Sequence, residues 1–104
     1  MKATRAETKQ ELLKSALKRA SRLAEEGVTC IEIKSGYGLD FDTEIKMLEV
    51  AQEIPDHIPV TTVTTYLGAH ALPHEYANKP NDYIDFICEQ VIPVVSERKL
   101  ASCV

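Results

Sequence analysis

The 104-residue chain contains no tryptophan, only three cysteines, and no apolar run near the roughly 20 residues that a membrane helix needs. Its first ten residues, MKATRAETKQ, also lack the apolar core of a signal peptide. We therefore expect a cytoplasmic protein with no membrane partner. Cys30, Cys88 and Cys103 are odd in number, lie among apolar neighbours and form no CxxC pair, which predicts buried, reduced thiols rather than disulfides or a metal site.

Positive charge is also scarce, since 12 lysines and arginines stand against 16 aspartates and glutamates and give a net charge of −4. No basic stripe is available to neutralise phosphates, so we expect no nucleic-acid partner. Hydrophobic residues make up 44% of the chain and charged residues 27%, as in ordinary globular domains. The length suits one domain but falls short of the roughly 250 residues of a closed (β/α)₈ barrel, so any barrel would be partial.

The first half of the chain shows two helical patterns around one strand pattern. Thr8 and Glu11 have capping-box spacing, and apolar residues then recur at helical period up to Gly27, which predicts a helix over 9–26. The β-branched residues of 28–34 predict a strand that ends in the loop SGYG. Asp42 or Thr43 can cap a second helix, which should end near Pro55.

The second half repeats this alternation. Residues 59–66 have the strongest strand composition and run into LGAHALP. Asn81 precedes a third helix, bent or ended near Pro93, and LASCV resembles the start of another strand. The apolar positions expected on one face of that helix are Ile84, Ile87, Cys88 and Val91.

The order αβαβα(β) has connections long enough for crossovers, which favours an α/β fold of parallel strands covered by helices, a single unit over 1–104. Unpaired sheet edges predict self-association into a homo-oligomer.

Two loops follow the carboxyl ends of the predicted strands, where parallel α/β folds collect their reactive groups. Tyr37 in SGYG and His70 in LGAH should share one rim. Tyr37 is either a partly buried aromatic covering the strand end or a ring projecting toward a ligand. His70 is either a histidine held by a backbone carbonyl or a hydrogen-bond donor and proton carrier.

Other polar residues give weaker signals. A zinc site from His70 and His74 is disfavoured, because Pro73 interrupts the helix that would align them. Gly36 and Gly38 lack the third glycine of a dinucleotide-binding motif, and the aspartates that follow them would repel phosphate. The remaining polar residues are interpreted as a charged strand end (Lys34), a solvent-facing turn (His57) and a helix-capping acidic cluster (Asp40, Asp42 and Glu44).

Several segments together resemble the imidazolonepropionase family. The long motifs are EIKSGYGLD at 32–40 and TYLGAHALP at 65–73, and KATR at 2–5, EGVT at 26–29 and EY at 75–76 extend the match. The resemblance implies an internal segment, a partial (β/α)₈ TIM barrel of the amidohydrolase type. It also implies hydrolysis of the cyclic amide of 4-imidazolone-5-propanoate to N-formimino-glutamate, with water activated by zinc or iron.

In that family the tyrosine of SGYG and the histidine of LGAH contact the substrate, which the resemblance carries to Tyr37 and His70. By the same analogy His70 would be catalytic, bonding the ring carbonyl and stabilising its growing charge. The family's His-x-His pair and later metal ligands lie outside this segment, so we expect the metal in the full-length parent, none bound here, and no activity from this chain alone. The alternatives are a self-associating α/β binding module and an inactive structural remnant.

Overall fold

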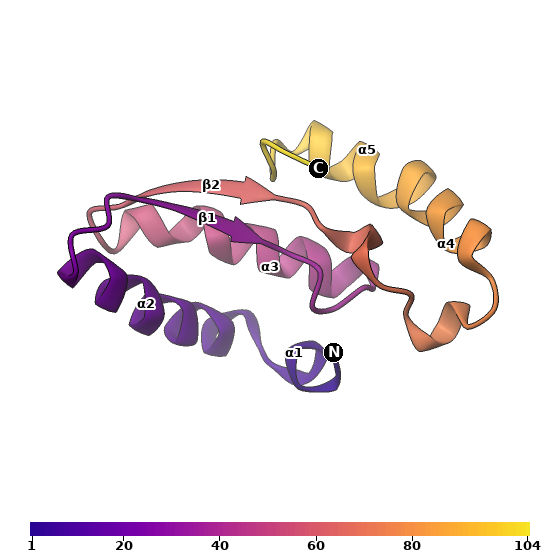
Figure 1. The fold of residues 1–104 in the computed structure, drawn as a ribbon, viewed down its shortest axis with the longest axis horizontal. Coiled ribbons are helices and arrows are strands. Elements are labelled where there is room, and N and C mark those ends of the chain that lie inside the picture. The colour runs from indigo at the N-terminus through magenta and orange to yellow at the C-terminus, as the bar shows by residue number, and fades with distance from the viewer.

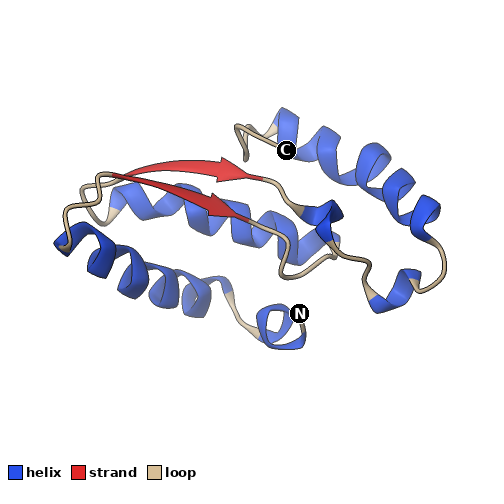
Figure 2. Ribbon diagram, in the orientation of Figure 1, coloured by secondary structure: helices blue, strands red, loops and turns tan.

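The computed structural model describes all residues from 1 to 104 and has two parallel strands flanked by helices (Figures 1 and 2). The strands are β1 (Cys30–Lys34) and β2 (Thr61–Thr65), paired in parallel from Cys30 opposite Thr61 to Lys34 opposite Thr65. The helices are α1 (Lys2–Ala6), α2 (Lys9–Glu25), α3 (Phe41–Glu53), α4 (Pro80–Phe86) and α5 (Ile92–Glu97), with a π-helical segment, Ile87–Val91, joining the last two. The predicted α/β class and parallel pairing are confirmed.

Local sequence signals explain where the first two long helices begin. Thr8 caps α2 through a complete capping box with Glu11, and Gly27 follows the helix with φ of 98°, as predicted. The choice of Asp42 or Thr43 as the cap of α3 is wrong, because Asp40, another member of the predicted capping cluster, is the cap and accepts from the Thr43 N–H at 3.0 Å. Asp42 lies inside the first turn, where its charge suits the helix dipole.

Helix α3 lies between two apolar clusters that together form the core. The first cluster packs α3 against the helices at the C-terminal end of the chain. The second packs the end of α3 and strand β1 against α2. Figure 1 accordingly shows helices on either side of α3. The first cluster contains Leu39, Ile45, Leu48, Tyr66, Tyr83, Ile87, Val91, Val95 and Leu100. The second centres on Ala20, Ile54 and Val60, with Ile31 and Ile33 of β1 packed against them.

The face predicted for the C-terminal helix is partly wrong. Its buried residues recur every fourth position, whereas Ile84 is 44% exposed and Cys88 is exposed. A π-helical turn holds more residues than an α-turn, so the segment before Pro93 keeps a four-residue spacing on one face. The buried residues are Tyr83, Ile87, Val91 and Val95.

The predicted burial of the cysteines is also wrong, because all three free thiols are exposed. Cys30 alternates with the two β1 isoleucines and lies on the sheet face that no helix covers. Cys103 lies at the sheet edge, where it forms a parallel bridge with Thr65. This bridge, supported by the Ser102 N–H donating to the Thr64 carbonyl at 2.8 Å, confirms that a third parallel strand begins near the end of the chain. No helix combines the length and apolar character needed to cross a bilayer.

Candidate functional site

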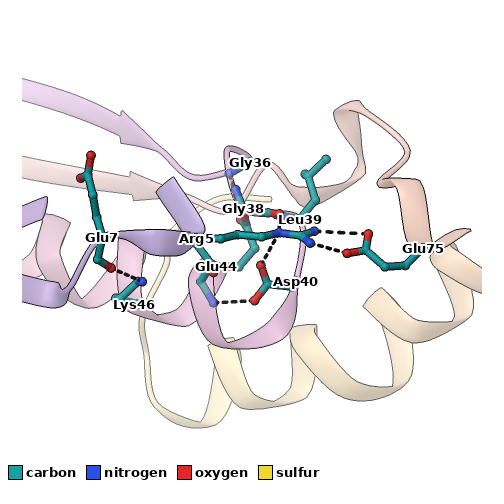
Figure 3. A network of polar contacts seen from close by, with 10 residues as sticks. Arg5, Glu7, Gly36, Gly38, Leu39, Asp40, Glu44, Lys46 and Glu75 are labelled. Carbon is teal, nitrogen blue, oxygen red and sulfur yellow. Dashed lines mark hydrogen bonds and ion pairs between the residues drawn. The ribbon is translucent and has the colours of Figure 1, made fainter. Parts of the chain in front are cut away.

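The loop after β1 is organised by one buried carboxylate. Glu44, in the first turn of α3, is 1% exposed and accepts the N–H groups of Gly36, Gly38 and Leu39 at 2.8 to 3.1 Å. Figure 3 shows its side chain among these residues. Converging backbone amides normally form a cradle for an external anion. Here an internal carboxylate fills that cradle, so these amides already have an acceptor within the chain.

The backbone of this loop occupies conformations that few residues adopt. Gly36 has φ of 100° and Leu39 has φ of 60°, although Leu39 is 3% exposed and part of the core. A Cβ on Gly36 would lie 2.5 Å from the Leu67 carbonyl oxygen and 2.7 Å from the His70 ring. The absence of a side chain therefore allows the two loops to meet.

An arginine from the N-terminal helix clamps the same loop from outside (Figure 3). Arg5 Nε donates to the Gly38 carbonyl at 2.8 Å, and Asp40 Oδ2 lies at the same distance from Nε as an ion-pair partner. The guanidinium also pairs with Glu75 beyond β2. The hydrogen bond between them raises the pKa of Arg5 and lowers that of Glu75.

The loop after β2 is fixed by two tyrosines. The buried Tyr83 hydroxyl donates to the Gly68 carbonyl at 2.8 Å. A Cβ on Gly68 would lie 2.0 Å from the Tyr66 hydroxyl, so this backbone rests directly on the phenol. The Ser35 hydroxyl accepts the Leu67 N–H at 3.1 Å and ties this loop to the end of β1.

The two loops meet through His70 and Gly36. His70 Nε2 lies 2.6 Å from the Gly36 carbonyl oxygen, one residue before Tyr37. The expectation that the two loops open at the same end of adjacent parallel strands is thus confirmed, and the interpretation of His70 as a ring held by a backbone carbonyl matches this contact. The Tyr37 side chain, by contrast, is 62% exposed. It lies at a groove of about 450 Å³ beside β1, between α2 and α3.

The remaining residues singled out in the sequence do not join this arrangement. His70 and His74 lie in separate 3₁₀ turns, 68–70 and 74–76, rather than on one helix. Lys34 ends β1 and lies 3.6 Å from Glu32, and His57 is an exposed turn residue 3.4 Å from Glu53. No group of three or more His, Cys, Asp or Glu side chains is arranged to hold a metal ion, so the zinc or iron implied by the resemblance has no ligand set among these residues.

Comparison with known proteins gives a consistent family. The chain is 57% identical over all 104 residues to the imidazolonepropionase of Alteromonas mediterranea, and 54% identical over the same length to those of Yersinia enterocolitica and Hahella chejuensis. In sequence, the chain corresponds to a segment of imidazolonepropionase. It spans about a quarter of the length of these relatives, 25% for the first and 26% for the other two. No family model matches the chain.

Three residues that shape the loops could not be assigned their roles from the sequence. Arg5 belongs to the quoted KATR motif but had no role assigned, and Tyr83 was read only as part of a helix. Glu44 was grouped with the capping acids, whereas it bonds the loop rather than the helix end. Its signal was a glutamate shortly after a loop with two glycines, where backbone amides need an acceptor.

Proposed function

We propose that this chain forms part of the catalytic domain of an imidazolonepropionase, which hydrolyses the cyclic amide of 4-imidazolone-5-propanoate to N-formimino-glutamate. Residues 1–104 would contribute one section of the substrate-binding surface. The observation that carries the proposal is the 2.6 Å contact between His70 and the Gly36 carbonyl, which joins the loops at the carboxyl ends of β1 and β2. In parallel α/β folds, ligands bind at this end of the strands.

In this proposal His70 hydrogen-bonds the carbonyl of the imidazolone ring and steadies the charge that develops there. Tyr37, whose exposed side chain follows Gly36 in the chain, holds the substrate ring in place. The roles of this chain are limited to binding, orienting and electrostatic stabilisation, because a metal ion would need ligands from elsewhere.

The fold supports a finer architectural proposal, that these residues are one wall of a (β/α)₈ barrel. Two strands and the start of a third run parallel, and the apolar side chains of β1 face the helices. Cys30, Glu32 and Lys34 are exposed on the other face, as expected of residues that line a barrel interior. The groove beside β1 is lined by Ile31 and Ile33 with residues of α2, which suits packing against a preceding strand.

A chimera tests the proposed function. The matching segment of the Alteromonas mediterranea enzyme is replaced by this chain, and kcat/KM for imidazolone hydrolysis is measured for the chimera and its variants. His70→Ala should lower kcat/KM by about 10²-fold, as loss of an oxyanion donor does. Tyr37→Phe should lower it by about 10-fold, through loss of one hydrogen bond.

Two substitutions serve as matched controls. His57→Ala removes an exposed histidine from the turn before β2, at the other end of the strand, and Tyr76→Phe removes a hydroxyl from the aromatic cluster beside Tyr83. Both should leave kcat/KM within about twofold of the chimera. If His70→Ala and Tyr37→Phe behave like these controls, neither residue acts on the substrate.

A second candidate is a self-associating α/β module without catalytic activity. It is favoured by the exposed face of β1, which presents Cys30, Glu32 and Lys34 without a covering helix. Light scattering should then give a discrete oligomer that melts cooperatively. A monodisperse monomer over a range of concentrations would exclude this candidate.

A further inference from the structure

We propose that Glu44 is a positioning residue for His70. It turns the Gly36 carbonyl so that this oxygen receives the Nε2 proton of His70, which leaves Nδ1 as the ring nitrogen that meets a ligand. The consequence for substrate depends on the proposed function, whereas the positioning itself does not.

Glu44 meets the requirements for holding a backbone in one conformation. A carboxylate that is 1% exposed is stable only when its oxygens accept strong hydrogen bonds. Gly36 N–H reaches both oxygens, at 2.8 and 3.1 Å, while Gly38 and Leu39 reach Oε1 at 3.0 and 2.9 Å. Moving the loop would leave a buried charge with fewer donors.

These bonds fix the peptide between Gly36 and Tyr37 from both sides. The amide before it, Gly36 N–H, and the amide after it, Gly38 N–H, converge on the same carboxylate. The φ of 100° at Gly36 then sets the plane of the intervening peptide. Its carbonyl oxygen is the atom that lies 2.6 Å from His70 Nε2. Glu44 therefore acts on His70 through two consecutive hydrogen bonds.

The chemistry of a carbonyl decides which imidazole nitrogen carries the proton. A carbonyl oxygen accepts and never donates, so Nε2 must carry hydrogen in this contact. A neutral His70 then offers a lone pair at Nδ1 and can accept from a ring N–H of a ligand. It can donate to a ring carbonyl only as the imidazolium. A ligand that presents an N–H next to a carbonyl, as a cyclic amide does, fits both protonation states.

The test is ¹⁵N-edited NMR of the histidine rings in the full 104-residue chain, at a pH where the rings are neutral and with no substrate present. The wild-type chain should show His70 with a protonated Nε2 and an Hε2 proton that exchanges slowly with water. His57, His70 and His74 are all exposed, so the ring contact is what distinguishes them. His57 and His74 make no ring hydrogen bond shorter than 3.4 Å and are internal references whose ring protons should exchange fast.

Glu44→Gln is the decisive variant, because with its oxygen at the Oε1 position its amide nitrogen would face the Gly36 N–H, which now donates to Oε2 at 2.8 Å, and cannot accept from it. We expect Hε2 exchange of His70 to accelerate at least about tenfold, with the His57 signals unchanged. Asp42→Asn is the matched control, since it removes an exposed charge from the same helical turn and has no bond to the loop. It should leave His70 as in the wild type.

Three results would overturn the proposal. The wild-type His70 could carry its proton on Nδ1, its Hε2 could exchange as fast as that of His57, or Glu44→Gln could fold and leave Hε2 protected. If circular dichroism shows that Glu44→Gln does not fold, Glu44→Asp decides, because its shorter carboxylate cannot reach all the amides. Protection of Hε2 must then fall below the wild-type value. Because no substrate is present, failure here is distinct from failure of the chimera kinetics.

Discussion

Replacing Tyr83 with phenylalanine removes the hydroxyl that anchors the loop carrying His70. Tyr83 is 2% exposed, and its hydroxyl donates to the Gly68 carbonyl at 2.8 Å. Phenylalanine keeps the ring, and therefore the stacking with Phe86 and the contact with Tyr76 at centroid distances of 6.1 and 5.2 Å. The change therefore isolates one buried hydrogen bond.

The cost follows from what is left behind. A buried carbonyl deprived of its donor costs about 1–3 kcal/mol, because water does not replace the lost partner. We expect the free energy of unfolding of Tyr83→Phe to fall by about 2 kcal/mol. In a domain of this size each kcal/mol corresponds to roughly 4–8 °C in Tm. The melting temperature should therefore fall by about 8–16 °C.

The same substitution has an independent signature at alkaline pH. Burial, followed by the charge of Glu44, raises the pKa of Tyr83 to about 12. An unfolded tyrosine titrates near about 10. Since the folded pKa is the higher one, the stabilisation is complete below pH 10 and is lost as pH rises toward 12, at up to about 1.4 kcal/mol per pH unit. The free energy of unfolding of Tyr83→Phe should therefore fall less steeply between pH 10 and pH 12 than that of the wild type.

Urea unfolding followed by far-ultraviolet circular dichroism, at one protein concentration and between pH 7 and 11, measures both effects. Tyr76→Phe is the control, since Tyr76 is a half-buried neighbour in the same aromatic cluster. Equal stability losses for the two variants at pH 7 would refute the anchoring role of the Tyr83 hydroxyl. Parallel pH curves for Tyr83→Phe and the wild type would refute the argument from burial.

Three further substitutions follow from the structure. Gly36→Ala should lower the free energy of unfolding in urea by at least about 2 kcal/mol more than Gly27→Ala does. Both glycines have positive φ, but of the two only Gly36 has atoms within 4 Å of the position that a Cβ would take. Equal losses would contradict the contact between the loops. Thr8→Ala should lower the free energy of unfolding by about 1 kcal/mol, because α2 loses its cap, and the helical circular dichroism signal should fall with it. An unchanged Tm would contradict this role of Thr8. Burial opposes ionisation of Glu49, but the bonds from Arg98 and Lys9 outweigh it and lower its pKa. Arg98→Ala should therefore lower the free energy of unfolding by up to about 1 kcal/mol at pH 7. This difference should vanish as the pH falls below the usual pKa range of a glutamate, because Glu49 is then protonated in both proteins. A difference that stays constant from pH 7 to pH 3 would argue against the ion pair.

The elements that could be predicted were those with strong local signals. The capping box at Thr8 located the start of α2, and the β-branched composition of 59–66 located β2. Crossover lengths indicated parallel pairing, which in turn placed both glycine-containing loops at one end of the sheet. The meeting of the loops follows from this topology.

The errors came from information that is not local. Cys30 and Cys88 have apolar neighbours in the sequence, but their exposure depends on which face of a sheet or helix another element covers. Ile84 and Cys88 each directly follow a buried residue of the C-terminal helix, and which of two adjacent residues is buried depends on the elements that pack against the helix. The two-glycine loop indicated that an acid nearby could accept its amides, but which acid does so, Asp42 or Glu44, is decided only when Gly36 and Leu39 take positive φ and direct their amides inward.

The internal acceptor of the β1 loop also determines how this loop can be transplanted. Residues 36–39 have no stable shape without the carboxylate of α3 that collects their amides. A protein engineer who grafts only SGYGL onto another strand would leave three inward-pointing N–H groups without a partner. Any transferable unit therefore has to include at least 35–44, the loop together with the first turn of the helix that follows it.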